Sequence, residues 1–401
     1  MSKKTVCILG AGITGLSVYN FLNRKSIETS IIECNPYAGG QAAFYGCKAA
    51  DGCVQCGVCL VRDALQQVKE TTSDSFFLSA QPQAVTRIPD NRFRVEFEIT
   101  PNKIDWRLCN GCGLCVTACP EQAIMAAAGG KFRVNDRCTD CGKCVAVCPT
   151  AAINLQRSAA KKELTADALV VASGFTPFNP AVNRKWGYGI GKRVITGQEL
   201  EQFFYQEEYL PVKEAQKVAF IQCIGSRNRK EGNGKCSRVC CAYALRMANR
   251  LKKEFPALQV DIYYMDIQKF GKQFAQFREK VARSCRFIRS IPVCIDTDAS
   301  GKPVLKWDDM NSEGRKAETY DLVVLSQGLA PAEKNGELAQ ILGLDLDRDG
   351  FFRNDVPGDR LNSHPGIFVA GACRKPMRID ECVEEAAAVS SQILSYLGGV
   401  L

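Results

Sequence analysis

The sequence contains a single histidine, His364, among its 401 residues. Histidine is the side chain whose unperturbed pKa lies nearest neutral pH, so a chain with only one offers no histidine-based acid–base site. His364 stands in the segment Ser363-His364-Pro365-Gly366, whose residue types are typical of a turn before a strand. We therefore interpret His364 as structural and expect no catalytic mechanism built on histidine.

Long hydrophobic runs are also missing, and none approaches the length of a membrane-spanning helix. Residues 1–4 lead directly into the first expected strand, which leaves no room for a signal peptide. We expect a cytoplasmic protein without direct membrane insertion. With 401 residues, 46% of them hydrophobic, the chain can bury the cores of two or three domains.

The formal net charge of +9 raises the question of nucleic-acid binding. No nucleic-acid motif accompanies the basic clusters, which are more often solvated faces than binding patches. The cofactors inferred below are anionic, so the excess lysine and arginine serves largely as their counter-charge. No nucleic-acid partner is expected.

Cysteine, by contrast, is abundant, with 22 residues. Disulfides are one explanation, but without an export signal, and with ligand-like spacings throughout, thiolates bound to metal explain the cysteines better. Such a metal load suits a reducing, anaerobic cytoplasm.

Two runs have the Cys-x-x-Cys-x-x-Cys-x-x-x-Cys-Pro spacing of bacterial ferredoxins, in which the fourth thiolate of each run ligates the other cluster. The runs predict one [4Fe-4S] cluster on Cys109, Cys112, Cys115 and Cys148, and a second on Cys138, Cys141, Cys144 and Cys119. A pair of zinc ribbons is the alternative, but the tandem repeat and the terminal prolines, Pro120 and Pro149, favour the clusters.

The N-terminal segment indicates a dinucleotide site. The apolar strand 5–9 runs directly into Gly10-Ala11-Gly12-Ile13-Thr14-Gly15 and then into a helical pattern at residues 16–22. Gly10 makes the turn, Gly12 admits the pyrophosphate at the helix N-terminus, and Gly15 allows close helix packing. A second strand, 28–32, ends in Glu33, whose carboxylate is placed to accept the ribose hydroxyls.

We favour FAD over NAD at this site because Gly39-Gly40 follows, a continuation seen in many flavin enzymes. Two further apolar strands ending in glycine, 166–174 and 321–328, are expected to return the chain to the flavin. The helix 380–397 should direct its positive N-terminal end at the ring. The candidate FAD-binding residues are Gly10, Gly12, Ile13, Thr14, Gly15, Glu33, Gly39, Gly40, Gln41, Ala172, Ser173, Gly174, Gly328, Gly371 and Ala372.

A further cysteine group follows the strand 218–222. Cys223 ends that strand, and after a basic loop Cys236 precedes the adjacent pair Cys240-Cys241, which opens a helix. A flavin reductase of the thioredoxin reductase type would carry its second glycine fingerprint here, and the fingerprint is absent. From the spacing alone, buried unreactive cysteines are an alternative to a four-thiolate site.

These segments resemble the A subunit of heterodisulfide reductases. The resemblance rests on residues 221–227 and 236–244, which are similar to that family's signature for a non-cubane-motif [4Fe-4S] cluster, and on residues 263–267 and 368–371. It runs through essentially the whole chain. It implies that Cys223, Cys236, Cys240 and Cys241 together hold a cluster.

The chain also departs from that family. Full-length members carry an extra N-terminal domain and usually a C-terminal ferredoxin-like domain, so the chain resembles a short form. Bifurcating members place a lysine after the double cysteine where this chain has Arg246, our one catalytic candidate, and an arginine stays charged and cannot release a proton. This difference argues against electron bifurcation, but the sequence alone does not decide whether the protein bifurcates electrons. Gly371-Ala372-Cys373 replaces the Gly-Asp of the wider flavoprotein group, so a carboxylate contact to the ribityl chain is not assured.

A fourth metal group is expected on Cys53, Cys56 and Cys59, which have the three-thiolate spacing, with Cys47 as the fourth ligand. A zinc or redox-inert site is the alternative because the spacing to Cys47 is not that of a ferredoxin. Cysteines outside such groups are interpreted as ordinary thiols, with Cys7 in the core: Cys7, Cys34, Cys285, Cys294, Cys373 and Cys382.

The expected fold class is α/β: an FAD/NAD(P)-linked, thioredoxin-reductase-like fold of two dinucleotide domains with an inserted α+β ferredoxin domain holding two [4Fe-4S] clusters. The expected boundaries are 1–99, 155–215 and 319–401 for the FAD domain, 100–154 for the ferredoxin insert, and 216–318 for a degenerate second nucleotide domain carrying a [4Fe-4S] cluster.

We therefore predict an FAD- and iron–sulfur-containing electron-transfer subunit that converts between two-electron flavin chemistry and one-electron cluster transfer. Its partners would be other subunits of a heterodisulfide-reductase-type or related redox complex and a ferredoxin or similar carrier, and a homodimer within the complex is compatible with this interpretation. The rivals are a self-contained NAD(P)H-dependent ferredoxin or disulfide oxidoreductase, and a pure electron-relay adaptor.

Overall fold

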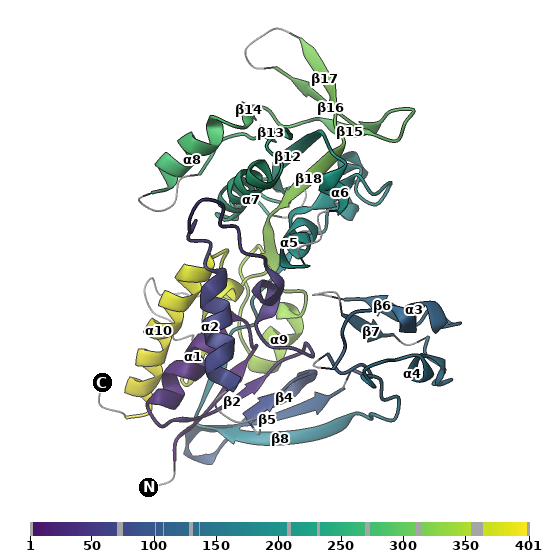
Figure 1. The fold of residues 1–401 in the computed structure, drawn as a ribbon. Coiled ribbons are helices and arrows are strands. Elements are labelled where there is room, and N and C mark those ends of the chain that lie inside the picture. The colour runs from purple at the N-terminus through teal and green to yellow at the C-terminus, as the bar shows by residue number, and fades with distance from the viewer. Residues whose placement is uncertain are drawn as a thin grey trace.

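In the computed structural model, two parallel five-stranded sheets form two stacked domains, and a small insert stands beside the first (Figure 1). The structure describes residues 3–69, 75–100, 102–106, 108–127, 131–135, 137–206, 210–230, 233–268, 273–309, 314–353 and 364–398. Ser363 of the expected turn lies outside these residues, and the turn at 365–366 leads into a strand, as predicted. No helix among the described segments combines the length and apolarity needed to cross a bilayer.

The first domain is built on the sheet that contains the N-terminal strand. Its strands, in spatial order, are β20 (Ile367–Val369), β9 (Ala168–Val171), β1 (Thr5–Leu9), β2 (Glu28–Ile32) and β3 (Phe76–Phe77). The helices of this domain are α1 (Ile13–Arg24), α2 (Val58–Lys69), α9 (Asn335–Leu342) and α10 (Ile379–Tyr396). β1 is covered on both faces by helices and a second sheet, and it is apolar and buried from Val6 to Leu9, with Cys7 0% exposed.

Three smaller sheets complete this half of the molecule. An antiparallel sheet of β4 (Ala80–Ile88), β5 (Arg92–Ile99) and β8 (Ala160–Ala166) packs its apolar side chains against the first parallel sheet. A two-stranded ribbon links the domains through β10 (Phe175–Pro177) and β19 (Leu329–Pro331). The insert between β5 and β8 contains α3 (Leu114–Ala118), β6 (Ile124–Ala126), β7 (Phe132–Val134) and α4 (Lys143–Ala146).

The second domain has a parallel sheet of the same size. Its strands, in spatial order, are β11 (Val194–Thr196), β18 (Leu322–Gln327), β12 (Lys217–Ile224), β13 (Gln259–Tyr263) and β14 (Arg286–Ile288). Its helices are α5 (Gly197–Gln206), α6 (Leu210–Lys213), α7 (Cys240–Glu254) and α8 (Phe274–Ala282). An antiparallel sheet of β15 (Cys294–Thr297), β16 (Pro303–Asp308) and β17 (Arg315–Thr319) extends from it.

The membership of this second sheet differs from the expected boundaries at residues 215 and 319. β11 and β18 come from segments that we assigned to the FAD domain, yet both pair in parallel with the strands of the second domain. β18 lies inside the sheet, between β11 and β12, and all six of its residues are buried. Its apolar sequence therefore reflects burial in the second core.

Candidate functional site

The turn between β1 and α1 has the geometry of a phosphate-binding site. Gly10 has a φ of +112°, and a Cβ there would lie 2.4 Å from the carbonyl oxygen of Ala172. A Cβ on Gly15 would lie 1.9 Å from the carbonyl oxygen of Gly10, so only glycine permits this helix–strand contact. A Cβ on Gly12 would meet no atom within 4 Å. The helix N-terminus at Gly12 is therefore open to a ligand.

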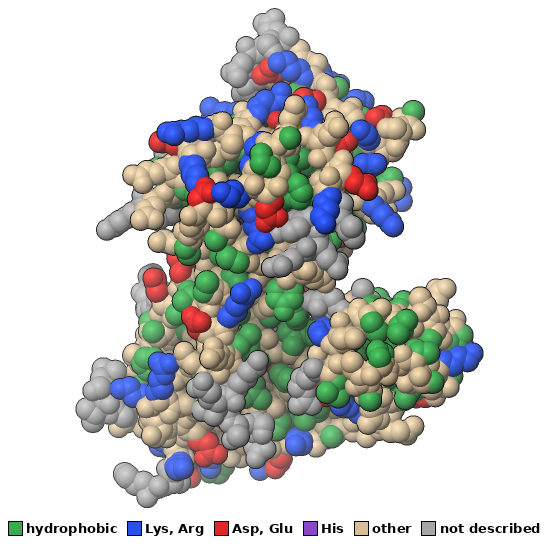
Figure 2. Space-filling view, in the orientation of Figure 1, with side chains coloured by type: hydrophobic (Ala, Val, Ile, Leu, Met, Phe, Trp, Pro, Cys, Tyr) green, Lys and Arg blue, Asp and Glu red, His purple; other side chains and the backbone are tan. Residues whose placement is uncertain are grey.

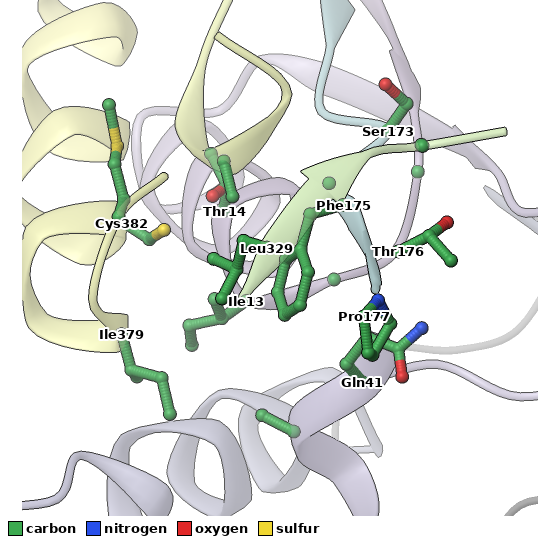
Figure 3. Close-up of a pocket in the computed structure, with 18 of the residues that line it drawn as sticks. Ile13, Thr14, Gln41, Ser173, Phe175, Thr176, Pro177, Leu329, Ile379 and Cys382 are labelled. Atoms are coloured by element: carbon green, nitrogen blue, oxygen red, sulfur yellow. The ribbon is translucent and has the colours of Figure 1, made fainter. Parts of the chain in front are cut away.

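A cavity of about 540 Å³ begins at this turn and extends to the second domain. Of the predicted FAD-binding residues, all but Gly15 and Gly371 line it. Figure 3 shows side chains from three parts of the chain around one space: Ile13 and Thr14 from α1, Phe175 and Leu329 from the β10–β19 ribbon, and Ile379 and Cys382 from the start of α10. Cys382, which we interpreted as an ordinary thiol, is thus a wall residue.

Glu33 lies at the cavity wall where β2 ends and is 4% exposed. Its Oε2 accepts a hydrogen bond from the backbone N–H of Ala11 at 2.7 Å. Its Oε1 accepts from the backbone N–H and the side-chain Nδ2 of Asn35, each at 2.7 Å. These bonds fix the carboxylate at the end of the strand, and Oε2, which accepts one of them, has further lone-pair capacity for a ribose hydroxyl.

The turn Gly371–Cys373, which precedes α10, places Ala372 in the cavity wall. Gly371 has a φ of +80°, and a Cβ there would lie 2.1 Å from Oγ1 of Thr14. Its backbone N–H donates to Oε2 of the buried Glu385 at 2.6 Å, and Arg374 pairs with the other oxygen of that carboxylate. Cys373 directs its Sγ to the carbonyl oxygens of Val171 and Ala370. The wall thus offers no carboxylate at 372–373 for a ribityl chain.

A buried ion pair also lines the cavity, and the sequence did not reveal it. Nζ of Lys48 lies 2.7 Å from Oε1 of Glu201, with side-chain exposures of 3% and 6%. Oε2 of Glu201 has no hydrogen-bond partner among the described residues. Burial raises the pKa of Glu201, while the charge of Lys48 lowers it. The only sequence signal was one lysine in an otherwise cysteine-rich loop.

Arg246, the catalytic candidate, lines the same cavity. Its Nε donates to the carbonyl oxygen of Val54 at 2.9 Å, and its Nη2 donates to that of Gln55 at 3.0 Å. Burial lowers the pKa of Arg246, and the nearby thiol of Cys56 raises it. The guanidinium thus holds backbone of the loop that carries the Cys53-x-x-Cys56-x-x-Cys59 run.

The ferredoxin insert brings each predicted ligand set together across its two runs. Burial, then the thiols of Cys109, Cys112 and Cys148, raises the pKa of Cys115. Burial, then the thiols of Cys138 and Cys119, raises the pKa of Cys144. All four cysteines of the second set line one small cavity: Cys119, Cys138, Cys141 and Cys144. Each of these groups of neighbouring thiols therefore includes the fourth cysteine of the other run.

The double-cysteine group gathers where β12 meets α7. Cys223, the residue before the last in β12, has a φ of +64°, and Cys240 and Cys241 open the helix. Contacts with the thiols of Cys223 and Cys241 raise the pKa of Cys240 well above its ordinary value. Burial, then the charges of Cys241 and Cys223, raises the pKa of Cys236. The four thiols therefore form one group.

The Cys47 group is looser. Cys47, Cys53 and Cys59 are exposed, Cys56 is half-buried at the cavity wall, and no hydrogen bond among the described residues joins two of these thiols. In the part of the chain that the structure describes, no three His, Cys, Asp or Glu side chains are placed to hold a single metal ion. The sixteen-cysteine ligand assignment stays a prediction.

The donor chemistry fits iron–sulfur clusters, because one sulfur in each group accepts a backbone N–H. The acceptors are Cys148 from Ala152 at 3.3 Å, Cys119 from Ala123 at 3.2 Å, Cys236 from Arg238 at 3.3 Å, and Cys53 from Gln55 at 3.4 Å. A sulfur that accepts such bonds is prepared to be a thiolate, and hydrogen bonds of this kind tune cluster potentials.

Comparison with known proteins identifies relatives over nearly the whole chain. Residues 108–153 match the family described as a 4Fe-4S dicluster domain. The chain is 30% identical over 421 residues to the iron-sulfur A subunit of the CoB–CoM heterodisulfide reductase from Methanocaldococcus jannaschii, covering 97% of this chain and 64% of that protein. It is 28% identical to the A subunit of the H(2):CoB-CoM heterodisulfide,ferredoxin reductase from Methanothermobacter marburgensis, covering 96% and 62%. The chain therefore spans less than two thirds of these relatives' length.

Solved structures share the fold at low identity. The thioredoxin reductase of T. acidophilum superposes with a TM-score of 0.56 at 16% identity, over 98% of this chain and 99% of that one. The NAD-dependent persulfide reductase of A. fulgidus superposes with a TM-score of 0.53 at 16% identity, over 97% of this chain and 58% of that one. The predicted thioredoxin-reductase-like fold and the predicted ferredoxin insert are both confirmed.

Proposed function

We propose, because the chain is a relative of the heterodisulfide reductase A subunits, that it is an iron–sulfur flavoprotein subunit converting between electron pairs and single electrons. One observation carries the proposal. The cavity that Gly12 and Glu33 line is also lined by Cys56 and by Val239, the residue before Cys240. A dinucleotide bound there would extend from the glycine turn toward two of the four cysteine groups.

FAD, when bound, would exchange two electrons, and [4Fe-4S] clusters would exchange one each. The chain's own residues would bind and orient. The open N-terminus of α1 at Gly12 would hold the pyrophosphate, and Glu33 would accept the ribose hydroxyls. The start of α10, through Ile379 and Cys382, walls the cavity. The four proposed cluster sites are the groups containing Cys109, Cys138, Cys223 and Cys47 described above.

The insert has the surface expected for brief docking of a redox partner. Five of its hydrophobic side chains are exposed: Leu108, Leu114, Met125, Val145 and Val147. Figure 2 shows hydrophobic side chains gathered on the face of the insert turned to the viewer. Exposed apolar patches mark interaction sites. We therefore propose a ferredoxin or another subunit of a heterodisulfide-reductase-type complex as partner, in a reducing cytoplasm that suits 22 cysteines.

The main rival is a self-contained NAD(P)H-dependent reductase. Such an enzyme needs a glycine turn after β12 to cradle a nicotinamide dinucleotide. This chain has Cys223 there, with the other thiols of its group beside it, and bound iron–sulfur would place negative charge at the pyrophosphate position. The negative charge of a bound cluster would repel the pyrophosphate of NADH at this position.

The test follows flavin absorbance in anaerobically purified protein. We expect no bleaching with NADH or NADPH and rapid reduction by a low-potential ferredoxin. A Gly12→Val variant purified without FAD controls for direct reduction of the clusters. Saturable hydride transfer from either nucleotide would overturn the proposal in favour of the self-contained reductase. A flavin that neither donor reduces, beside reducible clusters, would favour the relay adaptor.

A further inference from the structure

One loop of the first domain is held almost entirely by the second domain. Residues 45–57 join the helical turn at 40–44 to α2 and contain neither helix nor strand. The loop carries Cys47, Cys53 and Cys56 and reaches α7 and α8 of the second domain (Figure 1). An irregular segment has no ladder to satisfy its backbone carbonyls, so other groups must do so.

Two arginines on α7 supply those donors. Arg246 binds the carbonyl oxygens of Val54 and Gln55 at 2.9 and 3.0 Å. Arg250, one turn further along the same face, donates to the carbonyl oxygen of Cys47. The second domain therefore holds the backbone of the loop at Cys47 and between Cys53 and Cys56.

Charge pairs hold the same loop at two more points. The carboxylate of Asp51 lies 2.7 Å from Nζ of Lys253 on α7 and 2.8 Å from Nζ of Lys280 on α8. The buried pair of Lys48 and Glu201 ties the loop to α5. Three helices of the second domain thus hold the loop from Cys47 to Gln55.

Local backbone geometry shows why these contacts are needed. Gln55, between the second and third cysteines, has a φ of +50°, in the left-handed region that side chains disfavour. The Arg246 bond to its carbonyl oxygen holds that conformation, in which the N–H of Gln55 also donates to Sγ of Cys53. Strained backbone persists only where surrounding contacts determine it.

We propose that Arg246 and Arg250 are positioning residues for the Cys47/Cys53/Cys56/Cys59 site, which therefore assembles on α7 only when the two domains are docked. The inference rests on the proposed function, specifically on the fourth cluster. It gives Arg246 a role in shaping the ligand loop, and it makes the relative orientation of the domains a condition for filling that site.

The experiment measures iron per chain and the electron paramagnetic resonance of the reduced clusters in Arg246→Gln and Arg246→Lys. We expect iron to fall from about sixteen to about twelve atoms in both variants, because a lysine cannot form the forked pair of bonds. The coupled signal of the two ferredoxin-type clusters should be unchanged, which also reports that the chain is folded. Arg250→Gln should lose part of the same signal.

Arg283→Gln is the matched control, since it removes an exposed cation at the end of α8 that makes no described contact with the loop. A charge exchange, Asp51→Lys with Lys253→Asp and Lys280→Asp, should restore iron that Asp51→Lys alone loses. Full iron and an unchanged spectrum in Arg246→Gln would refute the inference, as would equal loss in Arg283→Gln. Wild-type protein with FAD and about twelve irons would refute it while leaving the proposed function intact. Wild-type protein without FAD would instead contradict the proposed function.

Discussion

Replacing Lys48 by methionine should destabilise the protein by an amount that depends strongly on pH. The substitution keeps the aliphatic volume but leaves the carboxylate of Glu201 buried, with the partner at 2.7 Å removed and Oε2 already unpaired among the described residues. Breaking a buried ion pair by removing one partner typically costs about 3–5 kcal/mol. The carboxyl group can escape part of that cost by taking up a proton.

The proton sets the magnitude. Burial already raises the pKa of Glu201 above the ordinary value of 4.5, and Lys48 is the largest contribution that lowers it. Without Lys48, the folded state keeps a proton that the unfolded state releases above that ordinary value. Holding it costs about 1.4 kcal/mol for each pH unit above that ordinary value, until the pH reaches the folded-state pKa of Glu201.

The sign follows from proton counts. The folded variant binds more protons than the unfolded chain between the two pKa values, so its free energy of unfolding falls as pH rises through that window. Lys48→Met should therefore be close to wild type near pH 5 and increasingly unstable toward neutral pH, reaching a plateau above the folded-state pKa of Glu201.

The assay is urea unfolding of wild type, Lys48→Met, Glu201→Gln and the double variant, at pH 5.5 and 7, followed by hydrogen exchange of α5. Exchange of one helix is preferable to a single global free energy because a chain with several domains and cofactors need not unfold in two states. The double variant should recover most of the loss at pH 7. A loss that is the same at both pH values, or that persists in the double variant, would refute the reasoning.

Three further outcomes are expected. Gly12→Val should fold and keep its iron but lose FAD, because the new side chain enters only the open phosphate site. Gly15→Ala should misfold locally, since its Cβ would lie 1.9 Å from the carbonyl oxygen of Gly10. Differential scanning fluorimetry separates the two variants, and Gly52→Ala, whose Cβ meets no atom within 4 Å, is the control. Cys240→Ser should lose about four irons but release FAD no faster than the wild type. Release of flavin as fast as in Gly12→Val would contradict the prediction that the FAD site and this cluster site are separate. Anaerobically purified protein should hold about sixteen irons, and a value near eight would remove the two less regular sites.

Features set by short-range sequence were predicted closely. The strands 5–9 and 28–32 have the bounds expected of them, and the helix expected at 380–397 is found at Ile379–Tyr396. The contact of Gly15 with Gly10 lies within a few residues of sequence, so residue type and spacing suffice to predict the turn. The ferredoxin runs carry their pairing in the spacing itself, because a repeated ligand pattern in a small insert has few ways to close.

Tertiary structure decided what depends on approach between distant segments. β18 is apolar and followed by a glycine, like a strand of the flavin domain, yet it pairs with β11 and β12. An apolar sequence predicts that a strand is buried but does not predict which sheet it joins. Glu201 looked like any helical glutamate, and nothing near Arg246 in the sequence indicated what it would bind. Their partners, Lys48 and Val54, lie more than 150 positions away in the chain, and no local pattern encodes such a contact. The sequence by itself thus determined the cofactor-binding motifs. Only the folding of one domain against the other determined how the cavity between them is charged and how the Cys47 loop is held, because those contacts exist only once both cores have formed.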